Sequence, residues 1–235
     1  MTSSLKDQLR AILKEKSVCQ GDFTLASGAK SDFYVDAKLT TSNPRAAMLV
    51  GRVGWELIQE TATARKIRVN SIGGLTMGAD WIALSIGIAA HLEDPETAVQ
   101  IFSVRKSAKE HGRLKRIEGN FSPGDSVVVI DDVITTGGST IQAIEAIEEA
   151  KGRVAFVIAL VDREEGGRGA IERLGHLVVP IFTRSDLVKT DASRRRNIGR
   201  RDRNTGLVRH GPQPGSQRAF FLACGHSRAV AETRS

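Results

Sequence analysis

The fold is decided by one stretch, residues Val127 to Thr140, which reads VVVIDDVITTGGST. Its first four residues are apolar and β-branched, which predicts a buried strand. Asp131 and Asp132 follow, and a turn rich in Thr, Gly and Ser comes next. A strand, a small-residue loop and a helix N-terminus together form an anion site, because loop N–H groups and the positive end of the helix dipole converge there.

The helix after this turn is predicted from Ile141, Ile144 and Ile147, which recur every three residues. Gly152 lies just past the expected end of the helix and is a candidate C-cap, because glycine adopts a left-handed conformation without steric cost.

The loop lacks the marks of the two commonest phosphate-binding loops. It contains neither the lysine of a GxxxxGK[ST] loop nor the GxGxxG spacing of a dinucleotide fingerprint. Instead, Asp131 and Asp132 can accept hydrogen bonds from vicinal hydroxyls while residues 135–140 hold a phosphate. This combination favours a ribose 5-phosphate ligand, and the alternative is an ordinary βα turn with two solvated acids.

The stretch resembles the phosphoribosyl-diphosphate (PRPP) motif of type I phosphoribosyltransferases. The resemblance implies an α/β fold with a mostly parallel central sheet flanked by helices, a small hood and a mobile catalytic loop. It further implies that Asp131 and Asp132 hold the ribose hydroxyls and stabilise developing positive charge at the ring. The residues of this motif that would bind PRPP are Asp131, Asp132, Val133, Ile134, Thr135, Thr136, Gly137, Gly138 and Ser139.

A second strand–loop–helix unit is predicted upstream. Residues Ile67 to Ile72 indicate a strand, GGLTMGAD follows at 73–80, and an apolar helix is expected from Trp81. A Gly-Gly pair alone is usually a turn, but two such loops on neighbouring strands offer adjacent anion sites. In the family the matching loop binds diphosphate, which implies that role for Gly74, Leu75 and Thr76.

A basic stretch, RKSAKEHGRLKRIEG, occupies residues 105–119. It is either a solvated surface loop or a lid that closes over a polyanion. The pattern RKxxKxHG is similar to the catalytic loop of orotate phosphoribosyltransferases. This resemblance implies PRPP contacts for Arg105, Lys106, Lys109 and His111, with the last three catalytic. It also implies a homodimer in which the loop at 105–118 reaches the neighbouring site.

The acceptor site is predicted from DREEGG at 162–167, which follows the strand expected over Val154 to Val161. The planar fork of Arg163 suits a carboxylate, because it donates two parallel charge-assisted hydrogen bonds. In the family the matching Arg binds the orotate carboxylate, so Arg163 and Thr135 would hold orotate. The alternative is an Arg163 that pairs with Glu164 or Glu165 at the surface.

The domain layout follows from composition and from the same resemblance. A domain over 1–187 is expected, with a hood from about 20–40 and 163–187. Residues Phe23 to Asp36 predict two short strands similar to the family's hood, although Ala26 stands where many members carry Lys. Because no stretch is apolar and long enough to span a bilayer, we expect a cytoplasmic protein without a membrane partner.

The extension at 188–235 is basic, with eleven Lys or Arg and three acidic residues, whereas the rest of the chain holds 23 basic and 24 acidic residues. This composition predicts disorder, because such a segment buries little apolar surface. An RNA- or DNA-binding arm is the alternative. Nucleic acid is not the expected partner, since no aromatic residues interleave the basic ones at 194–201.

The implied reaction is that of orotate phosphoribosyltransferases, which transfer the ribose 5-phosphate group of PRPP to orotate in UMP biosynthesis. The products are orotidine 5′-monophosphate and diphosphate. The implied cofactor is Mg²⁺, which bridges oxygens of diphosphate and ribose, and no residue is assigned as its direct protein ligand. The alternatives are a purine or uracil phosphoribosyltransferase and a regulator that senses PRPP and binds nucleic acid through the basic extension.

Overall fold

The computed structural model describes residues 3–24, 30–96, 99–107 and 116–188. Its larger unit holds the described parts of 1–18 and 35–189. The strands of this unit are β3 (Ser71–Leu75), β4 (Gln100–Val104), β5 (Ile117–Gly119), β6 (Ser126–Ile134), β7 (Arg153–Asp162) and β8 (Val178–Thr183). They form one sheet in the order β5-β4-β3-β6-β7-β8, in which β5 alone runs antiparallel to its neighbour.

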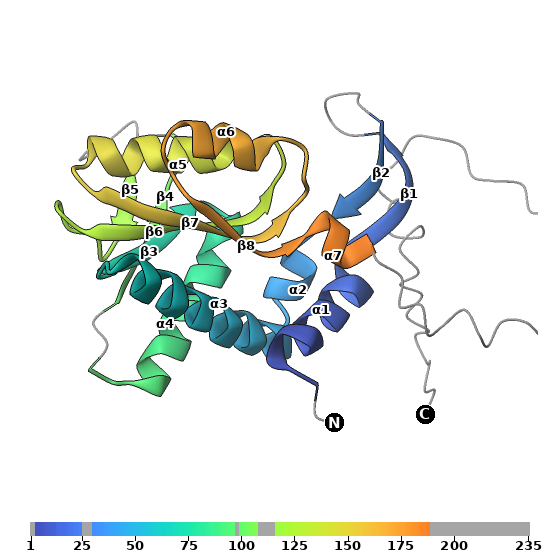
Figure 1. Cartoon of the computed structure of the whole chain (residues 1–235), viewed down its shortest axis with the longest axis horizontal. Helices are drawn as coiled ribbons and strands as arrows, with labels where there is room; N and C mark the ends of the chain where they lie inside the picture. The colour runs from blue at the N-terminus through green and yellow to red at the C-terminus, as the bar shows by residue number, and fades with distance from the viewer. Residues whose placement is uncertain (1–2, 25–29, 97–98, 108–115, 189–235) are drawn as a thin grey trace, which may run out of the picture. The chain divides into compact units, whose positions relative to one another are not determined.

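Helices cover both faces of this sheet. They are α1 (Leu5–Lys16), α2 (Lys38–Thr41), α3 (Pro44–Arg65), α4 (Gly78–Glu93), α5 (Gly138–Glu149), α6 (Gly167–Arg173) and α7 (Arg184–Val188). Figure 1 shows α5 and α6 on one face and α3 and α4 on the other. The structure confirms the predicted fold class, and its parallel strands place the carboxyl ends of β3, β6 and β7 at one edge.

The core is centred on β6, which is covered on both faces. Val127, Val128, Val129 and Ile130 are all at most 1% exposed, as expected for a central parallel strand. The apolar face of α5 packs over the sheet through Ile144 and Ile147. Burial of each such side chain contributes about 1.5–3 kcal/mol, so the strand that carries the two carboxylates is firmly held.

The predicted boundaries of the upstream strand–loop–helix unit, over residues 67–81, are wrong. The strand begins at Ser71 instead of Ile67 and includes both glycines, and α4 begins at Gly78 instead of Trp81. A Cβ atom on Gly73 would collide with the carbonyl oxygen of Phe102, and one on Gly74 with that of Ile130. The glycines therefore serve close packing between strands and do not form the turn.

The C-terminus of α5 also differs from its prediction. Lys151, not Gly152, adopts the left-handed conformation, with φ 67°. The N–H of Gly152 donates to the carbonyl of Ile147 at 2.8 Å, which satisfies a terminal carbonyl of the helix. A Cβ atom at Gly152 would lie 2.7 Å from Ile147 Cγ2 and 2.9 Å from the ring of Phe121. This glycine is needed for packing space.

The basic stretch ends in an element that the sequence did not predict. Residues Ile117–Gly119 form β5, which pairs with β4 in the register Ile117 to Val104. The N–H of Arg105 donates to the carbonyl of Arg116 at 2.8 Å and closes the base of the loop. Residues 108–115 lie outside the described part of the chain.

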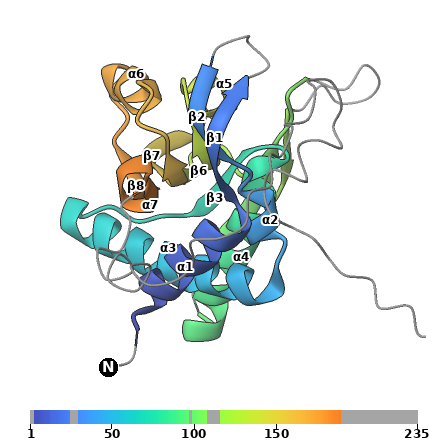
Figure 2. The same cartoon turned by 90° about the vertical axis from the view of Figure 1, so that its right-hand side faces the viewer.

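A separate two-stranded sheet is formed by β1 (Val18–Thr24) and β2 (Lys30–Val35). It belongs largely to a second unit, Cys19–Tyr34, and Figure 2 shows its two strands side by side. The first strand begins five residues before the predicted Phe23. The hood turn with Ala26 and the extension from 189 onward lie outside the described residues, so the expectations about them stay predictions. None of the described helices is long and apolar enough to cross a membrane.

Candidate functional site

A cavity of about 460 Å³ opens where β3 and β6 end. It brings together side chains and backbone from both strand–loop–helix units and from α2. The residues that line it are Lys38, Leu75, Thr76, Met77, Gly78, Lys106, Asp131, Asp132 and Ser139. Both predicted carboxylates thus share one space with residues 75–78 and with Ser139 of the second predicted anion-binding loop, whereas Thr135 and Arg163 are not among the lining residues.

Asp131 is the most buried acid of the cavity. Its carboxylate accepts a hydrogen bond from the hydroxyl of Thr140 in the first turn of α5. The pKa of Asp131 is raised to about 7, chiefly because burial disfavours the charged form; the Thr140 hydrogen bond lowers this pKa, and the negative charge of Asp132 raises it. A carboxylate that is buried and held by hydrogen-bond donors is an acceptor of fixed orientation for a ligand hydroxyl.

Asp132 lies against the start of α4. Its Oδ1 accepts a hydrogen bond of 2.9 Å from the N–H of Val133. A Cβ atom on Gly78 would collide with this carboxylate, so the position of Asp132 depends on a residue without a side chain. The start of α4 therefore leaves room for the carboxylate that β6 carries.

The loop after β6 leaves the N-terminus of α5 open. Gly137 adopts φ 86° and no side chain caps the helix. Gly138 and Ser139 are exposed, so the unpaired N–H groups of the first turn are accessible to an anion. On its other side the loop is fixed by a 3.0 Å hydrogen bond from the N–H of Gly167 to the carbonyl of Thr135.

The predicted lid residues fall into three groups. Lys106 lines the cavity. Arg105 instead forms an ion pair of 3.0 Å with Glu118 of β5 and is not among the lining residues. Lys109 and His111 lie outside the described residues.

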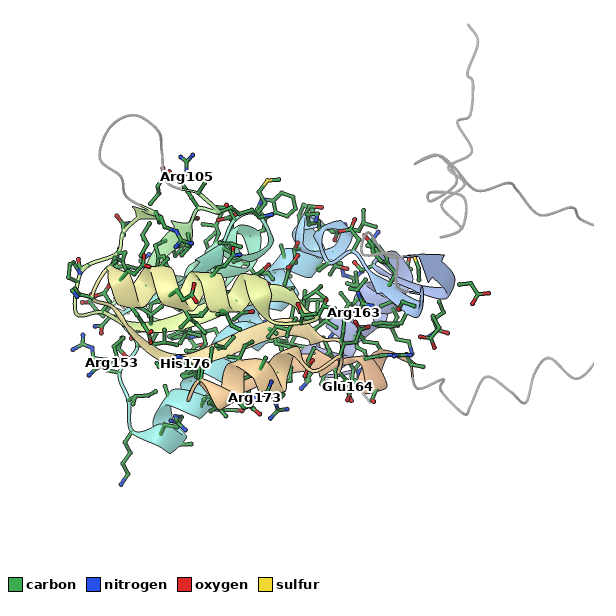
Figure 3. All side chains as sticks on the ribbon, turned by 90° about the horizontal axis from the view of Figure 1, so that it is seen from above. Arg105, Arg153, Arg163, Glu164, Arg173 and His176 are labelled. Carbon is green, nitrogen blue, oxygen red and sulfur yellow. The ribbon has the colours of Figure 1, made fainter. Side chains whose placement is uncertain are left out.

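Arg163 lies directly beside the loop after β6. Its N–H donates to the carbonyl of Ile134 at 3.0 Å, and its side chain is buried. Its Nη2 forms an ion pair of 2.6 Å with Glu165, whereas Glu164 accepts hydrogen bonds from Ser185. Figure 3 shows Arg163 and Glu164 at the opposite end of β7 from Arg153. The pairing with Glu165 that the sequence left open is thus present, but the guanidinium is buried and not solvated.

Sequence reasoning missed Lys38, Met77 and Gly78, which line the cavity, and Thr140 as the partner of Asp131. Lys38 starts a helix of four residues, which is too short for any apolar periodicity to reveal it. The signal for Thr140 was present, because a Thr in the first turn after an acidic strand end is placed to donate to it.

The donor set fits a hydrated hard cation. Among the described residues, no group of three or more His, Cys, Asp or Glu is placed to hold a metal. Asp131 and Asp132 nevertheless provide carboxylate oxygens in the cavity. Mg²⁺ typically keeps several waters and takes one or two carboxylates together with ligand phosphates, so this set is compatible with it.

A mostly parallel sheet with two anion-binding loops and a pair of acids at one cavity defines a class, the type I phosphoribosyltransferases. Comparison with known proteins agrees. The chain is 38% identical over 186 residues to the orotate phosphoribosyltransferase of Aquifex aeolicus, which covers 78% of this chain and 97% of that protein. It is 39% identical to that of Thermosynechococcus vestitus over 186 residues, 79% and 94% of the two chains.

A solved structure gives the same result. The crystal structure of Mycobacterium tuberculosis orotate phosphoribosyltransferase in complex with PRPP has a TM-score of 0.64 at 32% identity, covering 78% of this chain and 99% of that one. No protein-family model matches the sequence. The chain belongs to the orotate phosphoribosyltransferase family.

Proposed function

We propose that the protein is an orotate phosphoribosyltransferase, which transfers the ribose 5-phosphate group of PRPP to orotate and releases diphosphate. The observation that carries this proposal is the cavity that both loops and both acids share. The names of the relatives support it, as does the PRPP bound to the Mycobacterium tuberculosis relative. The reaction serves pyrimidine biosynthesis, and we place the enzyme in the cytoplasm.

The ribose 5-phosphate half of PRPP would lie over the end of β6. Asp131 and Asp132 accept hydrogen bonds from the two ring hydroxyls and stabilise the positive charge that develops at the ring. The 5-phosphate binds the N–H groups of the loop at 135–139, which are open at the start of α5. Binding energy far from the reacting carbon thereby fixes its position.

The diphosphate half would lie against residues 76–78 and the lid. The leaving group carries several negative charges, and Lys106 already lines this space. We infer that Lys109 and His111 add further positive charge when the lid closes. Asp131 or Asp132 would hold Mg²⁺, which would supply Lewis-acid neutralisation of part of this charge.

We assign the acceptor site to Arg163 and Thr135. The buried guanidinium of Arg163 is desolvated, so a charge-assisted pair with the orotate carboxylate is strong there. Arg163 pairs with the Glu165 carboxylate through Nη2. This ion pair shows that the guanidinium binds a carboxylate in its buried position. Thr135 is adjacent because the N–H of Arg163 donates to the carbonyl of the preceding residue, Ile134.

The acceptor assignment is tested with Arg163→Lys, which keeps the charge beside Glu165 but removes the planar fork. We expect the KM for orotate to rise about 10²-fold, because two charge-assisted hydrogen bonds are reduced to one point contact. The KM for PRPP should stay within twofold. Arg168→Lys, an exposed residue of α6 paired with Glu172, is the control. An unchanged orotate KM in Arg163→Lys would show that orotate binds elsewhere.

We also propose that the enzyme is a homodimer. Five large apolar side chains are exposed on α3 and α4, namely Met48, Trp81, Leu84, Ile88 and Leu92. A groove of about 560 Å³ lies between these helices. Several large apolar side chains exposed on two neighbouring helices are typical of an interface, and a second copy of the chain is the partner that we propose.

A further inference from the structure

We propose that Lys38 is a further ligand-binding residue of this site and that its ammonium group contacts the diphosphate of PRPP. This inference rests on the proposed function and names a contact that the sequence did not indicate. Lys38 lines the same cavity as Leu75 and Thr76, which the sequence analysis assigned to diphosphate.

The backbone of Lys38 is fixed, so its side chain starts from a defined point. Its N–H donates to Asp36 Oδ1 at 3.2 Å, and its carbonyl accepts from the N–H and hydroxyl of Ser42 at 2.9 and 2.6 Å. The next turn is anchored in the interior, where Thr40 and Ser17 share a buried hydrogen bond of 2.6 Å. A short helix held in this way presents its lysine reproducibly.

The present partner of the ammonium group is weak. Lys38 Nζ lies 3.8 Å from Asp36 Oδ1, near the outer limit of an ion pair, and the lysine side chain is 52% exposed. Exposed pairs of this kind contribute little. A ligand with several negative charges therefore competes successfully for the ammonium group.

The balance of charges in the cavity favours a contact between Lys38 and diphosphate. The cavity lining holds two cations, Lys38 and Lys106, and two acids, Asp131 and Asp132, so the excess of positive charge is small before any ligand binds. Diphosphate carries more negative charge than Mg²⁺ alone offsets. Lys106 belongs to the stretch that leads into the lid, whereas Lys38 is part of a folded helix. Lys38 thus supplies positive charge that does not depend on closure of the lid.

The test is direct binding of two probes, inorganic diphosphate and ribose 5-phosphate, each with Mg²⁺, to the full chain by isothermal titration calorimetry. Lys38→Ala should weaken diphosphate binding at least tenfold and change ribose 5-phosphate binding less than twofold. Lys38→Arg should restore most of the diphosphate affinity. In kinetics, Lys38→Ala should raise the KM for PRPP and leave the KM for orotate unchanged. Lys16→Ala, which removes one cation from α1, is the control for net charge.

Several outcomes would overturn the inference. The first is a Lys38→Ala variant that binds diphosphate within twofold of the wild-type affinity. The second is a Lys38→Ala variant that loses affinity for diphosphate and for ribose 5-phosphate equally. If the melting temperature of Lys38→Ala falls, Lys38→Met is used in its place, because methionine keeps the apolar stem of the side chain. Failure of the proposed function looks different: the wild type would then bind diphosphate through Lys38 but consume no orotate.

Discussion

At the scale of single residues, Asp131 carries the strongest link between packing and chemistry. The buried end of β6 desolvates its carboxyl group, and this raises its pKa to about 7. Thr140 opposes the shift, because its hydroxyl donates to the carboxylate and favours the charged form. The deprotonated carboxylate of Asp131 offers both oxygens as acceptors to a ribose hydroxyl. In the protonated acid, the carboxyl proton occupies one of these oxygens. The protonation of Asp131 should therefore limit PRPP binding on the acid side of neutrality.

The first prediction concerns pH. Protonation below about 7 should lower kcat/KM for PRPP, so this constant should rise with pH and level off above that value. Thr140→Val removes the hydrogen bond that lowers the pKa and should move the acid limb to higher pH. The ionisation of PRPP is the same in assays of the wild type and of Thr140→Val. A difference between their pH profiles is therefore caused by a group of the protein. Superimposable profiles would show that Asp131 does not govern the limb.

The second prediction concerns Gly78. An added methyl group would collide with the Asp132 carboxylate, whose Cγ lies 2.6 Å from the Cβ position. Gly78→Ala should lower kcat/KM for PRPP roughly 10²-fold, the cost typical of a displacement near 1 Å. Thermal unfolding should show no loss of stability, because alanine favours a helix. Gly169→Ala in α6, where the nearest atom is 3.5 Å away, is the control and should keep full activity. Normal activity in Gly78→Ala would contradict this role.

The sequence predicted part of the site at this scale. Four adjacent β-branched residues form a local signal that located the strand, but Asp131 and Asp132 were predicted to follow its end, whereas β6 continues to Ile134 and contains both acids. Lys38 was missed, since its place in the cavity depends on the packing of a four-residue helix and on no local pattern.

At the scale of elements, the end of α5 shows how a backbone rule can be satisfied by an unexpected residue. The left-handed position is filled by Lys151, while Gly152 provides space beside Ile147 and Phe121. A non-glycine residue in that conformation costs roughly 1 kcal/mol, which the neighbouring packing offsets.

The third prediction follows from this exchange of roles. Lys151→Gly should raise the free energy of unfolding by about 0.5–1 kcal/mol, because it relieves the left-handed strain. Gly152→Ala should lower it by about 1–3 kcal/mol, because its methyl group overpacks the contact with Ile147. Urea unfolding followed by circular dichroism measures both. The opposite order of the two variants would mean that Gly152 is the cap after all.

Strands of this sheet were predictable where their sequence is continuous and apolar, as in β6 and β7. The prediction failed at β3, because two glycines inside a buried strand look like a turn. Only the neighbouring carbonyls of Phe102 and Ile130 reveal why glycine is required there. The edge strand β5 was missed because its three residues acquire their structure from pairing with β4.

At the scale of the whole molecule, the exposed apolar face of α3 and α4 is the feature that a single chain leaves unexplained. Ile88 is 51% exposed and Leu92 78% exposed, on helices that otherwise pack against the sheet. The sequence of these helices does not predict an exposed apolar face, because an apolar helix such as α4 is equally consistent with complete burial.

The fourth prediction tests the dimer. Ile88→Glu should convert the protein to a monomer in analytical ultracentrifugation, because a charge would be buried in an apolar interface. If the lid completes the neighbouring site, turnover should fall with dissociation. Leu174→Glu, at an exposed position just after α6, should change neither. An Ile88→Glu variant with the sedimentation of wild type would place the interface elsewhere.

The central claim, that this cavity transfers a ribose 5-phosphate group to orotate, is tested most directly by the loss of orotate absorbance in the ultraviolet. The purified chain is supplied with PRPP and Mg²⁺, and adenine, hypoxanthine and uracil are run in parallel as acceptors. We predict consumption of orotate alone, dependent on both PRPP and Mg²⁺ and abolished in Asp131→Asn. Turnover of another base, or of none while PRPP still binds, would contradict the account.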